Sequence, residues 1–314
     1  MPIKSLQNKA SLFESKRVLT IAGITIGYFI VSYLLIGFKM DQVWLALLFN
    51  ACYFSSHLSR KLITGFSIFI VFWIIFDYMK AFPNYLYNTV HIESLYNAEK
   101  KLFGIASEGN IITPNEYWLN HSQAWLDALT GIFYLCWVPV PLAFAAYLFF
   151  KNRTAFLHFS LSFFIVNLLG FVIYYVYPAA PPWYVQLHGF EFLPNTPGNT
   201  AGLERFDTFF NTNTFHSLYA KSSNVFAAMP SLHSSYPVIV LYYGLKNKLG
   251  KINLIFGTIM IGIWFSAVYT SHHYVMDVLA GILCGLTGIS LFQWLATKNR
   301  HFKKRLQRFT KAIE

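Results

Sequence analysis

Two histidine motifs carry the residues best suited to chemistry in this chain. The first reads Pro230-Ser231-Leu232-His233, and the second reads His272-His273-Tyr274-Val275-Met276-Asp277. The apolar chain between them is long enough to cross a bilayer and return. Both motifs are therefore expected on one face of a membrane, where one imidazole could attack a phosphorus atom while the other serves the leaving group.

His273 and Asp277 are four residues apart at the start of an expected helix, so their side chains share one helical face. The carboxylate can accept the Nδ1–H of the imidazole, fix its tautomer and stabilise the cation formed when Nε2 attacks. The alternative is a polar pair that satisfies itself inside a helix bundle. An acidic side chain is costly so close to a bilayer, and this cost favours a functional role.

Ser231 is a typical N-cap residue after a proline-terminated loop, and the free N–H groups that follow it would form an anion site. His233 lies in this first helical turn, where the helix dipole favours the neutral imidazole and proton exchange near neutral pH. An ordinary helix cap with an interfacial histidine is the alternative for this motif taken alone. The coincidence of both motifs on one face favours catalysis.

The composition indicates a membrane protein. Of its 314 residues, 55% are hydrophobic and 12% are charged, and this charged fraction is about half that of a typical soluble domain. Apolar runs close to the roughly 20-residue spanning length recur along the chain. They predict an all-α, polytopic transmembrane bundle of about eight spans, at 18–38, 42–58, 62–79, 129–150, 155–177, 232–246, 252–270 and 277–296.

The distribution of positive charge predicts the orientation. In this topology eighteen of the 24 Lys and Arg residues fall in inner segments, and six fall outside. This positive-inside bias predicts cytoplasmic termini and an extracytoplasmic active site. The basic tail, 298–314, is expected to lie on anionic lipid of the inner leaflet. Because the cations have this topological role, the net charge of +11 does not indicate nucleic-acid binding.

The expected organisation has three parts. An N-terminal membrane region, 1–128, holds three spans and an extracytoplasmic interfacial segment with short helices. A catalytic helix bundle, 129–297, follows and contains a long proline-braced extracytoplasmic loop, 178–230, which is expected to act as a lid. The cytoplasmic tail, 298–314, completes the chain. The long first apolar stretch, with no small-residue cleavage site after it, is not typical of a cleavable signal peptide.

The motif residues resemble the type-2 phosphatidic acid phosphatase superfamily, whose second motif is Pro-Ser-Gly-His and whose third is Ser-Arg-x5-His-x3-Asp. Here they read Pro230-Ser231-Leu232-His233 and Ser266-Ala267-x5-His273-x3-Asp277. The resemblance implies that His273 is the phosphorus nucleophile, that Asp277 orients it, and that His233 is the acid for the leaving group.

Within that superfamily, the chain looks most similar to the inositol phosphorylceramide synthase branch, the aureobasidin-target type. The resemblance covers roughly 155–296. It rests on Tyr177-Pro178-Ala179-Ala180-Pro181-Pro182-Trp183-Tyr184, on Phe226-Ala227-Ala228-Met229-Pro230-Ser231-Leu232-His233-Ser234, and on His272-His273-Tyr274 followed by Asp277-Val278-Leu279-Ala280-Gly281.

Three cations of the simple phosphatases are missing. Those enzymes carry a first motif, Lys-x6-Arg-Pro, whose cations hold the phosphate. The corresponding positions here are Gly170 and Tyr177, and the third-motif arginine is Ala267. A phosphomonoester carries about −1.5 to −2 charge near neutral pH, whereas a diester carries one negative charge. A site without these cations suits a diester donor, which favours transfer from a phospholipid over dephosphorylation.

A cation near the phosphate is still expected, and the candidate is Lys80, with a snorkelling interfacial lysine as the alternative. Asp77 could bind an inositol hydroxyl, although a pair with Lys80 is favoured. Lys221 and Arg205 are weaker candidates for the cation. His272 is favoured as a structural neighbour. The candidate substrate-binding residues are Ser231, Pro181, Pro182, Trp183, Tyr184, Lys80, Asp77 and His272.

The leading hypothesis is a lipid phosphotransferase that moves inositol phosphate from phosphatidylinositol to ceramide or dihydroceramide and releases diacylglycerol. One alternative is a phosphatase for phosphatidic acid or a polyprenyl pyrophosphate, and another is a transporter or scaffold. A transporter would not explain His233, His273 and Asp277. No cofactor or metal is expected, although a metal site formed by His233, His273 and Asp277 is a further alternative, and protein partners are left open. The three cysteines fall in expected spans, where neither a disulfide framework nor a thiolate metal site is expected. A bacterial inner membrane is the favoured location, and a Golgi-type lumen is the eukaryotic alternative.

Overall fold

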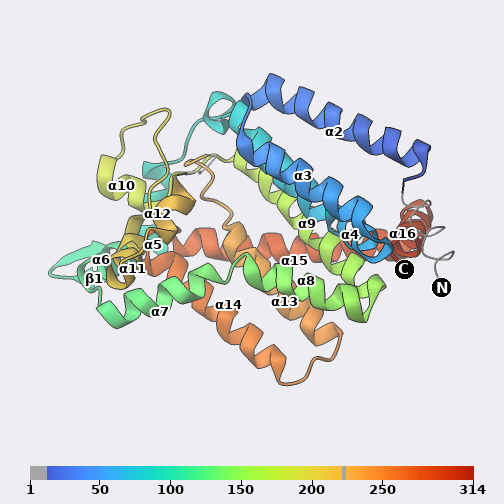
Figure 1. Cartoon of the computed structure of the whole chain (residues 1–314). Helices are drawn as coiled ribbons and strands as arrows, with labels where there is room; N and C mark the ends of the chain where they lie inside the picture. The colour runs from blue at the N-terminus through green and yellow to red at the C-terminus, as the bar shows by residue number, and fades with distance from the viewer. Residues whose placement is uncertain (1–12, 221–223) are drawn as a thin grey trace. The chain divides into compact units, whose positions relative to one another are not determined.

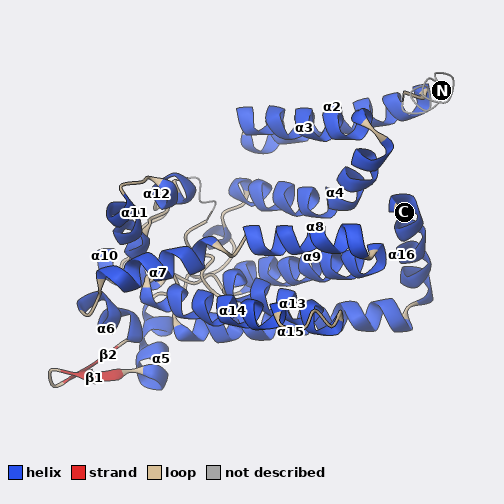
Figure 2. Cartoon of the chain, turned by 60° about the horizontal axis from the view of Figure 1, so that its bottom comes forward, coloured by secondary structure: helices blue, strands red, loops and turns tan. Residues whose placement is uncertain are grey.

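The structure, a computed structural model, describes residues 13–220 and 224–314. Over these residues the chain is almost entirely helical, and one two-stranded sheet is present (Figure 2). The chain forms two compact units. One comprises Met1–Phe82, so far as it is described, with His301–Glu314, and the other comprises Pro83–Arg300. The predicted all-α polytopic architecture is confirmed.

The described part of the first unit contains three apolar helices and a basic one. The apolar helices are α2 (Ser15–Ile36), α3 (Met40–Ser55) and α4 (His57–Tyr78), and a short 3-10 turn, η1 (Met79–Ala81), follows α4. Ser56 caps α4, because its hydroxyl accepts the N–H of Ser59 at 3.0 Å. The C-terminal helix α16 (Arg300–Ile313) buries Leu306 and Ile313 on one face and exposes most of its Lys and Arg residues.

The second unit holds both histidine motifs. Its long helices are α7 (Ala124–Leu135), α8 (Pro139–Lys151), α9 (Arg153–Val176), α13 (Leu232–Lys246), α14 (Ile252–Tyr269) and α15 (Val275–Lys298). Helix α13 packs against α9, α14 and α15 (Figure 1). The first turn of α13 and the start of α15 therefore lie close together, although the connection between them runs through the whole of α14.

Within residues 13–220 and 224–314, six segments are long and apolar enough to cross a bilayer, so the chain is an integral membrane protein. They are Ser15–Ile36, His57–Ala81, Ala124–Lys151, Arg153–Val176, Ile252–Tyr269 and Val275–Lys298. The other two expected spans correspond to α3, with 16 residues, and α13, with 15 residues. At 1.5 Å per residue such helices reach roughly 22–24 Å, which is less than the ~30 Å hydrocarbon core.

The expected span 129–150 consists of two helices rather than one. The turn between α7 and α8 lies at residues 136–138, and α8 begins with Pro139 and Pro141 in its first turn. Proline lacks the N–H group that a helix interior needs but is tolerated in a first turn. The two prolines were therefore a readable sign of this break, which lies beside the first turn of α13.

The segment before α7 is expected to contain short helices, and it contains α5 (Glu93–Phe103) and α6 (Pro114–Asn120). Between them lies a hairpin that the sequence analysis did not predict, formed by β1 (Ile105–Ser107) and β2 (Asn110–Ile112). Both turn residues, Glu108 and Gly109, have positive φ, as the favoured two-residue hairpin turn requires.

The long loop 178–230 is itself largely structured. It contains α10 (Pro182–His188), a 3-10 turn η3 (Ala201–Leu203), α11 (Glu204–Phe210) and α12 (Thr214–Tyr219). Backbone hydrogen bonds join its two ends, since Ala179 N donates to Phe226 O at 2.9 Å and Ala228 N donates to Ala179 O at 3.2 Å. His91 N also donates to Pro178 O at 2.8 Å. These bonds fix the chain that leads into Pro230 and the α13 motif.

Candidate active site

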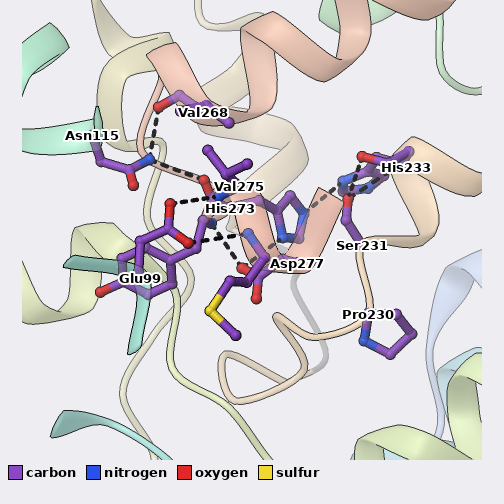
Figure 3. A network of polar contacts seen from close by, with 12 residues as sticks. Glu99, Asn115, Pro230, Ser231, His233, Val268, His273, Val275 and Asp277 are labelled. Atoms are coloured by element: carbon purple, nitrogen blue, oxygen red, sulfur yellow. Dashed lines mark hydrogen bonds and ion pairs between the residues drawn. The ribbon is translucent and has the colours of Figure 1, made fainter. Parts of the chain in front are cut away.

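The two motif histidines lie side by side. Nε2 of His273 is 3.3 Å from Nδ1 of His233, although the residues are 40 positions apart in the chain (Figure 3). His273 comes from the short connection before α15, and His233 comes from the first turn of α13. The structure thus brings together the two imidazoles that the topology argument expected on one face.

Asp277 faces the other nitrogen of His273. Its Oδ2 lies 3.5 Å from His273 Nδ1 and accepts the N–H of Tyr274 at 2.8 Å, so the carboxylate also caps α15. Among the described residues, neither His273 Nδ1 nor Asp277 Oδ1 has a hydrogen bond. A small side-chain rotation can therefore close the 3.5 Å gap as positive charge develops on the imidazole, since such bonds are often long before substrate binds.

His273 is held in the neutral state that a nucleophile requires. Its side chain is buried, and this burial lowers the pKa of His273 to about 4, with a smaller opposing effect from the nearby backbone of Ala228. At neutral pH the imidazole therefore carries one proton. If that proton lies on Nδ1, which faces Asp277, the Nε2 lone pair is free to attack phosphorus.

Glu99 is a buried carboxylate at this site that the sequence analysis did not name. Its two oxygens accept the N–H groups of Val275 at 2.9 Å and Met276 at 3.1 Å, in the first turn of α15 (Figure 3). Burial raises the pKa of Glu99 to about 7, while these backbone N–H groups favour the ionised form. A carboxylate at a helix N-terminus is electrostatically favourable. Glu99 thus fixes the start of the helix that carries Asp277.

Asn115 holds the connection between α14 and α15. Its Nδ2 group donates to the carbonyl oxygens of Val268 at 2.8 Å and His273 at 2.9 Å (Figure 3). A readable capping box, Thr113 with Glu116, predicts the start of α6. Nothing local predicts that the Asn115 side chain reaches residues more than 150 positions away.

Ser231 caps α13, as expected, by accepting the N–H of Ser234 at 3.3 Å. Its own N–H donates to the backbone oxygen of Asp277 at 2.9 Å, which joins the two motifs directly. The close approach depends on Gly281, because a Cβ atom there would lie 2.1 Å from Ser231 O. Ser235 also donates its hydroxyl to Gly281 O at 2.6 Å. Glycine is thus the residue that lets α15 contact the start of α13.

The segment Pro181-Pro182-Trp183-Tyr184 is buried beside the site. Trp183 N donates to Ser271 O at 3.0 Å, and Ser271 has a left-handed φ of 59° directly before the two histidines. The Tyr184 hydroxyl donates to Glu191 O at 2.7 Å and accepts the Leu193 N–H at 2.8 Å. The segment therefore braces both the histidine connection and the long loop.

His272 points away from His273 into the core of the long loop. Its Nε2 lies 3.0 Å from Thr200 O, and its ring stacks between those of Tyr134, at 5.5 Å, and Tyr219, at 4.5 Å. Burial lowers the pKa of His272 well below its ordinary value. These contacts support the structural interpretation of this residue.

The three positions that lack the phosphatase cations are closely packed. A Cβ at Gly170 would lie 2.6 Å from a methyl group of Leu232. Tyr177 stacks on His91, with ring centroids 3.8 Å apart. Ala267 is fully buried, and its carbonyl oxygen accepts the backbone N–H groups of His272 and His273.

The candidate cations that the structure describes are paired with carboxylates. Lys80 Nζ lies 2.7 Å from Asp77 Oδ1 in the first unit, which confirms the favoured pair. Arg205 Nε donates to Asp127 Oδ1 at 2.7 Å in the second unit. Lys221 lies outside the described residues. Neither Lys80 nor Arg205 is therefore among the residues that the structure brings together at the two histidines.

Comparison with known proteins agrees with the motifs. The profile of the PAP2 superfamily matches residues 105–291, which include both histidine motifs. The chain belongs to the PAP2 superfamily. The predicted superfamily is thus confirmed, and Glu99 lies outside the matched segment.

Several relatives are synthases. Phosphoinositol dihydroceramide synthase of Bacteroides thetaiotaomicron is 42% identical over 303 residues, which cover 96% of this chain and 99% of that protein. Inositol phosphorylceramide synthase of Candida albicans is 33% identical over 178 residues, 54% of this chain and 38% of that protein. The catalytic subunit from Saccharomyces cerevisiae is 33% identical over 117 residues, 37% of this chain and 29% of that subunit. No solved structure matches the chain.

Proposed function

We propose that this protein is a lipid phosphotransferase that moves inositol phosphate from phosphatidylinositol to ceramide or dihydroceramide and releases diacylglycerol. The observation that carries the proposal is the contact between His273 Nε2 and His233 Nδ1, with Asp277 against the remaining nitrogen of His273. This arrangement lies in a chain that is 42% identical, over 96% of its length, to a phosphoinositol dihydroceramide synthase.

In the first step the Nε2 lone pair of His273 attacks the diester phosphorus. The bond between phosphorus and the glyceride oxygen breaks, its electron pair leaves with that oxygen, and protonated His233 supplies a proton. The products are diacylglycerol and a phosphoinositol group on His273. Asp277 stabilises the positive charge that develops on the attacking imidazole. The 3.3 Å gap leaves no room for phosphorus between the nitrogens, so the two rings must separate when substrate binds.

In the second step neutral His233 takes the proton of the ceramide primary hydroxyl as its oxygen attacks phosphorus. The phosphorus–nitrogen bond breaks, and its electron pair returns to Nε2 of His273. This covalent route splits one difficult displacement into two easier ones. Direct transfer, with His273 as a base, is the alternative. Protein that is incubated with headgroup-labelled phosphatidylinositol and denatured at alkaline pH, where phosphohistidine is stable, should retain the label only on the covalent route.

The charge of the site favours a diester donor over a monoester. Gly170, Tyr177 and Ala267 carry no charge where simple phosphatases of the superfamily carry cations. A monoester brings nearly two negative charges near neutral pH and needs more compensation than a singly charged diester. The braced loop 178–230 and its buried aromatic residues support exclusion of water, which protects the phosphohistidine from hydrolysis.

Purified protein in detergent should transfer the headgroup of phosphatidylinositol to fluorescent ceramide and release diacylglycerol in equal amount. Hydrolysis of phosphatidic acid, measured in the same detergent, should be much slower, because the doubly charged monoester has no matching cations. A parallel preparation of His273→Ala controls for contaminating enzymes. Faster release of phosphate from phosphatidic acid than transfer to ceramide would reject the proposed function in favour of a phosphatase.

The active site is proposed to face away from the cytoplasm, on the periplasmic side of the inner membrane in a bacterium. The positive-inside distribution supports this orientation. In a background without native cysteines, an impermeant thiol reagent should label Glu93→Cys in intact cells and Lys251→Cys only after permeabilisation. Both positions are exposed. The reverse labelling pattern would invert the proposed topology.

A further inference from the structure

Tyr134 makes a shorter contact with His233 than His273 does. Its hydroxyl oxygen lies 2.8 Å from His233 Nδ1, compared with 3.3 Å for His273 Nε2. Tyr134 is fully buried in the last turn of α7, just before the helix break. The ring of Trp137, from the break itself, packs at 4.3 Å against the imidazole of His233. The imidazole of His233 is therefore held by packing against Trp137 and by one strong hydrogen bond with Tyr134.

The direction of this hydrogen bond follows from the neighbouring histidine. For His273 to act as a nucleophile, its proton must lie on Nδ1, toward Asp277, which leaves a lone pair on Nε2. A second lone pair on His233 Nδ1, only 3.3 Å away, would repel it. Nδ1 of His233 must therefore carry a proton, both in the neutral ring and in the protonated ring that the first transfer step requires, and the Tyr134 oxygen accepts it. The single hydroxyl proton of Tyr134 is then free for Tyr219, with which it is hydrogen bonded.

We infer that Tyr134 is the positioning residue for His233, in the way that Asp277 is for His273. By accepting Nδ1–H it fixes the tautomer and leaves Nε2 as the nitrogen that exchanges protons with the glyceride oxygen and the ceramide hydroxyl. The assignment of those two exchanges rests on the proposed function. A neutral phenol suits this place better than a second carboxylate, because it orients the imidazole without adding negative charge beside an anionic substrate.

Tyr134→Phe removes the hydroxyl and keeps the ring that packs on His233 and His272. It should lower kcat for headgroup transfer by about 10- to 100-fold, the scale known for removal of the hydrogen-bonded partner of a metal-ligating histidine, with KM little changed. Tyr243→Phe is the matched control, since Tyr243 is also buried and its hydroxyl is also bonded, to Ser162 at 2.7 Å. It should retain nearly full activity.

A readout that needs no substrate separates this inference from the proposed function. Nitrogen-15 NMR of histidine-labelled protein, with the His233 signal assigned from His233→Asn, should give the Nδ1–H tautomer in the wild type. The variant Tyr134→Phe should show a mixture of the Nδ1–H and Nε2–H tautomers of His233. Tyr219→Phe, which leaves the acceptor in place, should produce a smaller loss of kcat. An unchanged tautomer in Tyr134→Phe, or equal activity losses in Tyr134→Phe and Tyr243→Phe, would overturn the positioning role.

Discussion

Replacing His273 by alanine is expected to abolish headgroup transfer while the protein remains inserted in the membrane and folded. The substitution removes the Nε2 lone pair that would attack phosphorus, and Nε2 lies 3.3 Å from the partner histidine. Loss of a nucleophile of this kind costs on the order of 10⁴-fold or more in kcat. The measurement is transfer from phosphatidylinositol to fluorescent ceramide by purified variant, with thermal unfolding recorded on the same sample.

The pair His273 and Asp277 should behave as one unit. Asp277→Asn is expected to lose most activity, and the double variant His273→Ala/Asp277→Asn should be no worse than His273→Ala alone, because Asp277 acts through the imidazole. His121→Ala, at an exposed helix end, is the matched histidine control and should retain wild-type turnover. Near-normal activity in His273→Ala, or additive losses in the double variant, would contradict the nucleophile assignment.

The pH profile gives an independent check on the same residue. Burial lowers the pKa of His273 to about 4, from an ordinary value of about 6.5, so the nucleophilic neutral form persists as pH falls through the usual histidine range. Activity carried by this form is lost only as pH falls through about 4. The acid limb of kcat/KM that belongs to the nucleophile should therefore lie well below pH 6. A limb at the ordinary histidine value would show that the imidazole is not desolvated in the working enzyme.

The contact between His273 and Asp277 could be predicted because its geometry is local. His273 and Asp277 meet through the four-residue spacing of a helix, and the return of the chain to the same face follows from hydropathy. The same local logic located six spanning segments. It missed the α7–α8 break despite two readable prolines, and the two further spans that it predicts, at α3 and α13, stay predictions because these helices are short for a bilayer.

Residues that position the pair could not be predicted, because their contacts join distant parts of the chain. Glu99 reaches residues 176 and 177 positions away, and Tyr134 reaches a histidine 99 positions away. A lone Glu in an amphipathic helix and a lone Tyr in an apolar span are both common in ordinary packing. Only the folded chain gives these side chains their partners, because α5 packs against α15 and the end of α7 lies against His233 in α13.

The packing of α13 against α15 makes Gly281 the position where a substitution has the second largest expected effect on activity. A Cβ there would lie 2.1 Å from the backbone oxygen of Ser231, and backbone cannot rotate away as a side chain can. In Gly281→Ala the two helices must separate by about 1 Å near His233 and Asp277, and a misplacement of this size can reduce kcat about 10²-fold. Alanine raises intrinsic helix stability by up to about 1 kcal/mol, which offsets part of the strain, so activity should fall more than stability.

Two further glycines turn this prediction into a graded series. A Cβ at Gly285, one turn along α15, would lie 3.3 Å from Ser235 O, a contact that a few tenths of an ångström relieve. A Cβ at Gly257 in α14 would meet nothing within 4 Å. Turnover should therefore be near wild type in Gly257→Ala, moderately reduced in Gly285→Ala and lowest in Gly281→Ala, with unfolding temperatures measured in parallel. Wild-type kcat in Gly281→Ala would mean that transfer does not depend on the close contact between α15 and the start of α13, and that the hydrogen bonds of Glu99 and Asn115 align the two histidines instead.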